Sequence, residues 1–146
     1  MLKESTANAA VTTPQDLKRE TIIANVARFF AFVSTVGVIF YSFEVKWFTL
    51  HPVLMTFAFT YLISEGILTA REMKSRPMDR KQLVQTHLLL QFGTLTCGGF
   101  GFLVILSNKI YYNNLHFQTW HSLLGLATVV IICIEVLIGL YIQYRW

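Results

Sequence analysis

The stretch His51–Ala70, HPVLMTFAFTYLISEGILTA, decides the fold, because it is long and apolar enough to cross a membrane as a helix. After its opening His-Pro pair, the main polar interruptions are Ser64, Glu65 and scattered threonines. About 20 such residues span a hydrocarbon core of about 30 Å. A histidine at the start of so apolar a segment either lies at the membrane interface or has a use inside the membrane.

The rest of the chain has the same character. Of its 146 residues, 54% are hydrophobic and only 14% are charged, whereas soluble domains carry about 25% charged residues. A chain of this size cannot hide so much apolar surface in a water-soluble core. Four apolar runs account for the excess: residues 21–43, 47–70, 83–106 and 120–143.

These runs predict an all-α membrane protein, a four-helix transmembrane bundle of antiparallel neighbours joined by short loops. Their continuous apolarity lacks the alternation of a membrane β-barrel. Residues 1–20 are polar and contain acids, which is unlike a secretory signal or a transit peptide. We therefore expect a polar tail over residues 1–20 and one transmembrane domain over residues 21–146, with the first helix kept as an anchor.

The basic residues are distributed unequally between the two sides of the membrane. If the N-terminus lies on side A, side B carries only Lys46 and Lys109, and Arg28 can reach side A from inside the first helix. Side A carries Lys3, Lys18, Arg19, Arg71, Lys74, Arg76, Arg80, Lys81 and Arg145. The positive-inside rule places both termini in the cytosol, or in the matrix for a mitochondrial protein. An endomembrane location (ER or vesicle) is favoured, with the mitochondrial inner membrane as the alternative.

Two histidines occupy equivalent places in different spans. His51 and His121 lie near the starts of the second and fourth helices, and both helices begin on side B. Their imidazoles should lie at similar depth, where two neutral rings can ligate a haem iron axially. The alternative is that each histidine simply ends a helix at the interface. Zinc is disfavoured, because no Cys, Asp or Glu at that depth completes a tetrahedron.

Other residues in the spans have plainer interpretations. Cys97 and Cys133 suit small packing positions better than a disulfide. Glycines in the third and fourth helices could make room for a haem or simply allow close helix packing: Gly93, Gly98, Gly99, Gly101 and Gly125. No phosphate-binding loop, Ser/His/Asp set or nucleic-acid-binding face is evident in the sequence.

Two acidic residues repeat the spacing of the histidines. Glu65 follows His51 by 14 residues and Glu135 follows His121 by 14, which is about 21 Å along a helix. Both should approach side A, at the level of His87. We expect satisfied interfacial carboxylates, with His87, Arg80 and Lys81 as candidate partners, in preference to a proton-coupling role.

The stretch HPVLMTFAFTYLISEGIL resembles the second helix of the cytochrome b561 family, especially the short eukaryotic domain-containing members. The later stretch HFQTWHSLLGL and the intervening His87 also resemble that family in order and spacing. The resemblance implies six helices and two b haems, which carry electrons from ascorbate to monodehydroascorbate or ferric iron. It implies that His51 and His121 ligate the side-B haem and that His87 ligates the side-A haem. It also implies substrate-site roles for His116, Lys81 and Arg80.

The chain differs from this pattern because it contains the first four of the six helices and no further histidine to pair with His87. Three alternatives remain open: a shortened one-haem form, a second site completed by another subunit of a homodimer or larger membrane complex, or a scaffold without haem. The favoured interpretation is a transmembrane b-type cytochrome with one complete bis-histidine haem site and an ascorbate-like donor. The alternative is a non-catalytic subunit of a larger assembly, such as a mitochondrial respiratory complex.

Overall fold

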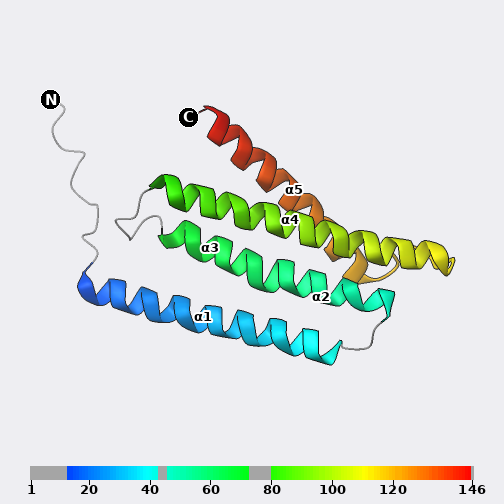
Figure 1. Ribbon diagram of the computed structural model, residues 1–146. Coiled ribbons are helices and arrows are strands. Elements are labelled where there is room, and N and C mark those ends of the chain that lie inside the picture. Colours follow the sequence, from blue (N-terminus) through cyan, green and yellow to red (C-terminus); the bar gives the residue numbers. More distant parts are fainter. Residues whose placement is uncertain (1–12, 43–45, 73–79, 146) are drawn as a thin grey trace.

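The protein is built from helices alone in the part that the computed structural model describes, residues 13–42, 46–72 and 80–145, with the backbone only at Arg80. The first span is α1, Pro14–Tyr41 (Figure 1). The second span begins with the 3₁₀ turn η1, Trp47–Thr49, and continues as α2, Leu50–Thr56, η2, Phe57–Leu62, and α3, Ile63–Glu72. The third and fourth spans are α4, Arg80–Tyr111, and α5, Trp120–Arg145.

These four spans are long and apolar enough to cross a membrane, with mean hydropathy from 1.5 for the second span to 2.7 for α5. The expected all-α fold with four transmembrane helices is therefore confirmed. The side of the membrane that each terminus faces stays a prediction, as does the division into a tail over residues 1–20 and a domain over residues 21–146.

Two helices are longer than expected, and at α1 local capping adds the extra turns. α1 begins at Pro14 instead of residue 21, because Thr13 and Asp16 form a capping box and Pro14 suits the first turn. α4 extends beyond residues 83–106 at both ends. The polar residues around α1's start are thus helical from Pro14 onward, within the stretch expected to be a tail.

The second span is continuous but not uniformly α-helical. Pro52 lies in the first turn of α2, where its missing N–H costs no helical hydrogen bond. Phe57–Leu62 form a π-helical segment, a local widening that is frequent at functional sites. Sequence pattern alone predicted a plain helix here.

Close packing joins the second span to α4, which runs alongside it (Figure 1). A Cβ atom at Gly93 would lie 3.3 Å from Leu62, one at Gly98 would lie 3.2 Å from Phe59, and one at Gly101 would lie 3.2 Å from Leu54. The close-packing interpretation therefore holds for these three glycines. Gly99 and Gly125 face open space, and Gly125 lines a cavity described below.

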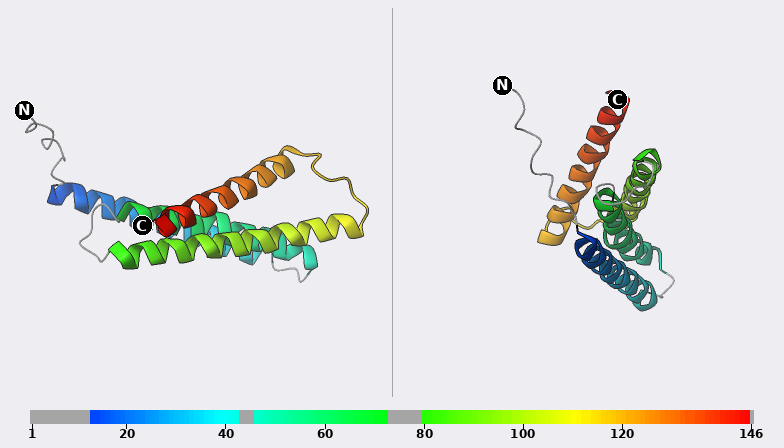
Figure 2. Two further views of the ribbon diagram at one scale, coloured as in Figure 1. Left: turned by 90° about the horizontal axis from the view of Figure 1, so that it is seen from above. Right: turned by 90° about the vertical axis from the view of Figure 1, so that its left-hand side faces the viewer.

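The fourth span is less embedded than the others. α5 contacts α4 and is inclined to the other helices (Figure 2). Only Ile132 and Val136 of α5 are buried. Glu135 is exposed and makes no hydrogen bond or ion pair with any described residue.

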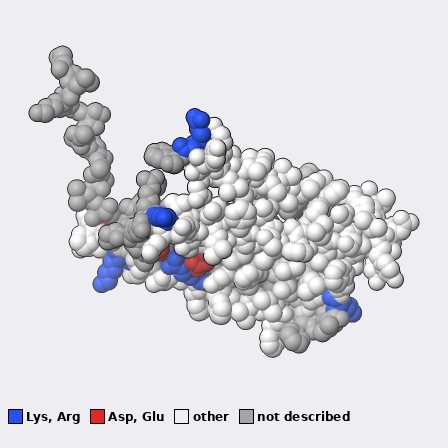
Figure 3. Space-filling model, turned by 45° about the horizontal axis from the view of Figure 1, so that its top comes forward, with Lys and Arg blue, Asp and Glu red and all other residues white. Residues whose placement is uncertain are grey.

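Charged side chains gather toward the two ends of the molecule, with a broad uncharged band between them (Figure 3).

Arg28 does not simply reach toward side A: its guanidinium lies 3.0 Å from Glu65 and 3.0 Å from Glu72, which joins α1 to α3. The carboxylate of Glu65 is thus satisfied as expected, but its partner is Arg28 instead of His87 or Lys81. The orientation of a helix about its axis decided this pairing, and hydropathy does not reveal it.

Candidate functional site

The structure brings His51 of α2 and His121 of α5 together. Their ring centroids lie 6.4 Å apart with an interplanar angle of 85°. His51 is half-buried, whereas His121 is exposed. The backbones of α2 and α5 are not in contact, so the two helices approach each other through these side chains.

The ring of His51 is fixed by a hydrogen bond across the helix pair. Its Nδ1 lies 2.9 Å from the carbonyl oxygen of Gly101 in α4. A carbonyl only accepts, so Nδ1 carries the hydrogen and donates it. The neutral ring therefore keeps Nε2 unprotonated, which is the tautomer that can ligate a metal.

His121 is positioned by the start of α5. Thr119 and Ser122 cap each other, with the Thr119 hydroxyl accepting from the Ser122 N–H and the Ser122 hydroxyl accepting from the Thr119 N–H, both at 3.2 Å. This reciprocal cap fixes the first turn, which contains His121. The preceding loop turns through positive φ angles at Asn113 and Phe117.

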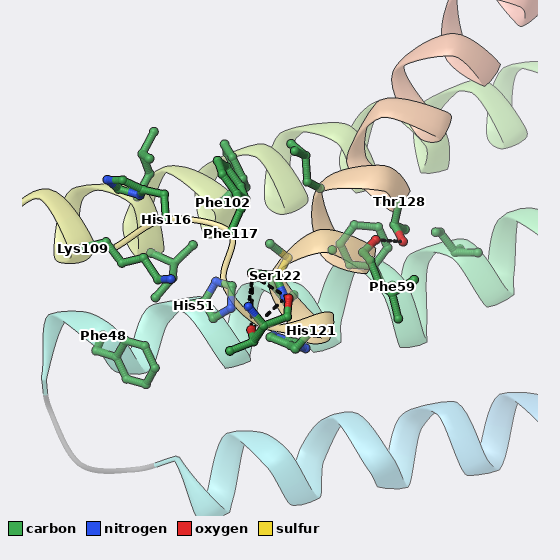
Figure 4. A pocket seen from close by; sticks show the side chains of 18 residues that line it. Phe48, His51, Phe59, Phe102, Lys109, His116, Phe117, His121, Ser122 and Thr128 are labelled. Atoms are coloured by element: carbon green, nitrogen blue, oxygen red, sulfur yellow. Dashed lines mark hydrogen bonds between the residues drawn. The ribbon is translucent and has the colours of Figure 1, made fainter. Parts of the chain in front are cut away.

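The two histidines line a cavity of about 660 Å³ between the second span, α4, α5 and the loop before α5 (Figure 4). This volume is in the range of small-molecule and cofactor sites, about 300–1,000 Å³. Aromatic and aliphatic side chains make up most of its wall: Phe48, Met55, Phe59, Ile63, Phe102, Ile105, Leu106, Phe117, Leu124 and Leu126. The polar groups that line it are Lys109, His116, Thr119, Ser122 and Thr128, besides the two histidines.

His87 lies at the other end of the helix pair. Its Nδ1 is 3.0 Å from the carbonyl oxygen of Gly66 in α3, the same kind of bond that His51 makes with Gly101. Gly101 follows His87 by 14 residues on α4, so the two bonds are about 21 Å apart along that helix. Within the described residues, no other histidine meets His87.

The remaining candidates separate into two places. His116 lines the same cavity as His51 and His121, with its ring centroid 6.1 Å from that of Phe117. Lys81 is exposed at the start of α4, far along that helix from the cavity. The side chain of Arg80 lies outside the described residues. Lys109 is a cavity residue that sequence reasoning did not single out, although it is one of only two basic residues on side B.

The chain matches the family model for eukaryotic cytochrome b561 over residues 50–145. The chain belongs to this family. The match includes every candidate histidine and excludes α1. The resemblance seen in the HPVLM and HFQTWH stretches is thereby confirmed, and membership implies that the family's cofactor, haem b, is bound.

Curated relatives point to the same family. The chain is 34% identical over 84 residues to the transmembrane reductase CYB561D2 of Bos taurus, 33% identical to that of Mus musculus and 32% to that of Homo sapiens. Each match covers 56% of this chain and 38% of the relative, so the matched region spans about two fifths of the relatives' length. No solved structure matches the chain significantly.

The residues at the cavity fit a haem. An imidazole nitrogen binds a transition-metal ion at about 2 Å, so two rings that shared one ion would have centroids at most about 6 Å apart. The 6.4 Å separation of His51 and His121 agrees with that value. Within the described residues, no group of three or more His, Cys, Asp or Glu side chains gathers as a tetrahedral site would require. Two nitrogen donors above an apolar cavity are the donor set of a bis-histidine haem.

Proposed function

We propose that this protein is a transmembrane electron carrier that holds one haem b between His51 and His121. Its donor is ascorbate or a similar small reductant on side A, and its acceptor is monodehydroascorbate or ferric iron on side B. The observation that supports this most directly is the close approach of the two imidazoles, one of them fixed as a ligating tautomer, on the wall of an apolar cavity.

When bound, haem b supplies a one-electron couple at its iron. The chain's own residues supply the environment of that couple. Nδ1–H of His51 donates to Gly101, which orients the ring and raises the basicity of the ligating Nε2. The apolar wall excludes water, so the protein lowers the cost of moving an electron by limiting solvent rearrangement around the site.

Two further sets of residues have proposed substrate roles. Lys81 and Arg80, at the start of α4, attract an anionic donor to side A, because Lys and Arg side chains raise the local concentration of anions. His116, at the cavity beside Phe117, offers a hydrogen bond to an acceptor on side B. These roles rest on the family resemblance and on the position of each residue.

His87 is proposed as one ligand of a second haem, at the side-A end of the helix pair. The bond from its Nδ1 to Gly66 prepares the ring as the bond to Gly101 prepares His51. A second ligand would come from a protein segment other than those described. A second subunit of a homodimer or a larger complex would satisfy this requirement.

Counting haem per chain by the pyridine haemochrome assay tests the proposal on purified protein. We expect at least one haem per chain, lost in His51→Ala and in His121→Ala. Thr128→Val is the matched control, because Thr128 lines the same cavity but donates its hydroxyl hydrogen to Leu124 of its own helix. Full haem content in either histidine variant, with helical content unchanged, would overturn the proposed ligand pair. Absence of haem in the wild-type protein would favour the scaffold function instead.

A further inference from the structure

Lys109 has an unusual position for a charged residue. It lies near the end of α4 and lines the cavity that His51 and His121 share (Figure 4). Among the described residues that line this cavity, it is the only Lys, Arg, Asp or Glu. It follows Gly101, the partner of His51, by eight residues, which is about 12 Å along α4 toward side B.

The side chain of Lys109 is held across the loop before α5. Its Nζ donates to the carbonyl oxygen of Leu115 at 3.1 Å. An ammonium group has three N–H donors, so two remain for another acceptor. The loop bond thus keeps the charge at the cavity, at the side of His51 where His116 also lies.

We propose that Lys109 binds the carboxylates of the haem that His51 and His121 hold, an inference that rests on the proposed function. Haem b carries two propionate side chains, which are anionic near neutral pH. The cavity wall is mostly apolar, and an anion left there without a partner is costly. An ammonium group in the wall supplies charge-assisted hydrogen bonds to those carboxylates.

The position of Lys109 would also set the orientation of the haem. The carboxylate edge would then point along α4 toward side B and the loop, because Lys109 lies beyond Gly101, the partner of His51, in that direction. Lys46, the other basic residue of side B, precedes the 3₁₀ turn and does not line the cavity. It therefore serves as a matched control for general charge on this side.

The test compares two cofactors in the full-length apoprotein in detergent: haemin, and haemin dimethyl ester, whose carboxylates are methylated. Absorbance titrations give the affinity of each for the wild type, Lys109→Met, Lys109→Arg and Lys46→Met. We expect the wild type to prefer haemin over the ester by about tenfold, the size of one charge-assisted hydrogen bond. Lys109→Met should lose that preference by weakening haemin binding alone, whereas Lys109→Arg and Lys46→Met should keep it.

The outcomes separate this inference from the proposed function. If Lys109→Met keeps the preference for haemin, Lys109 does not bind the carboxylates, although the histidine pair still stands. If both cofactors bind equally more weakly to Lys109→Met, Lys109 acts through packing of its stem, and the inference is wrong. If Lys109 instead binds a lipid headgroup, Lys109→Met reduces the phosphatidylglycerol that copurifies and leaves the preference unchanged, which also overturns it. If the wild type binds neither cofactor, the proposed function fails together with the inference.

Discussion

The helix pair formed by the second span and α4 carries a histidine at each end, and the two ends are supported in different ways. His51 bonds to Gly101 and His87 bonds to Gly66, at 2.9 and 3.0 Å. At the first end, Gly101 packs closely against Leu54, and the imidazole of His51 lies beside that of His121 in the wall of the cavity. At the second end, Gly66 has only ordinary contacts, and the adjacent Glu65 is held by Arg28 of α1.

The difference shows that the same hydrogen bond, from a histidine Nδ1 to a glycine carbonyl, can be supported either by close packing or by an ion pair. Close helix packing positions the carbonyl of Gly101, which orients His51. The carbonyl of Gly66, which orients His87, instead follows Glu65, whose carboxylate is ion-paired with Arg28 of α1. The packed end lies wholly within the family match at residues 50–145, but the ion-paired end depends on Arg28, which lies outside it. Variants at each end can therefore separate the two supports.

The largest expected effect is the loss and chemical rescue of a ligand at the His51 end. His51→Gly should lose the bound haem, because one axial nitrogen is removed, and added imidazole should restore it by filling the vacated space. His87→Gly should keep haem at the His51–His121 pair without imidazole. Absorbance spectra of haem-titrated protein measure both results. A need for imidazole in His87→Gly and not in His51→Gly would reverse the assignment of the two ends.

A smaller effect is expected when Arg28 is removed from the other end. Arg28→Met leaves Glu65 and Glu72 without the cation that lies 3.0 Å from each. The exposed fractions of these side chains are 31% for Arg28 and 18% for each glutamate. Water therefore screens the ion pairs in part, and the loss of stability should be about 2 kcal/mol, less than for a fully buried pair. The apparent melting temperature in detergent should fall, and the triple variant with Glu65→Gln and Glu72→Gln should recover part of it.

That measurement would contradict the ion-pair account if Arg28→Met melted at the wild-type temperature. Haem content measured in the same variant tests whether the His51 end and the His87 end are supported independently. Haem content at the His51–His121 pair should stay at the wild-type level in Arg28→Met, because the packed end does not use Arg28. Loss of that haem would show that the two ends are not supported independently.

The sequence predicted the four spans and the meeting of His51 with His121, because both follow from hydropathy and from the depth of helix starts. It did not predict the pairing of Arg28 with Glu65 and Glu72, since that depends on how two helices are rotated about their axes. The π-helical segment Phe57–Leu62 has no signature in composition. Lys109 was missed because its place at the cavity depends on how the loop before α5 folds over it.

Packing at the two glycines gives a further comparison. A methyl group at Gly101 would lie 3.2 Å from Leu54 and 3.4 Å from Met55, whereas one at Gly66 would have its nearest contact at 3.8 Å, with Gln91. Gly101→Ala should therefore destabilise the protein by about 1 kcal/mol or more through overpacking. Gly66→Ala should be close to neutral or slightly stabilising, because alanine favours the helix. Melting temperatures of the two variants should differ in this order, and equal values would show that the helix pair adjusts at no cost.

The smallest effect is expected at the ion pair of Glu20 with Arg71, which also joins α1 to α3. Arg71 and Glu20 lie 2.9 Å apart, but their side chains are 51% and 39% exposed. Water and salt screen such a pair, so Arg71→Gln should change stability by about 0.5 kcal/mol or less. The melting temperature should stay within error of the wild type at high salt, while Arg28→Met remains destabilised under the same conditions. Equal loss in both variants would mean that α1 is held by its total charge, and that the half-buried Arg28 has no special part in supporting the His87 end.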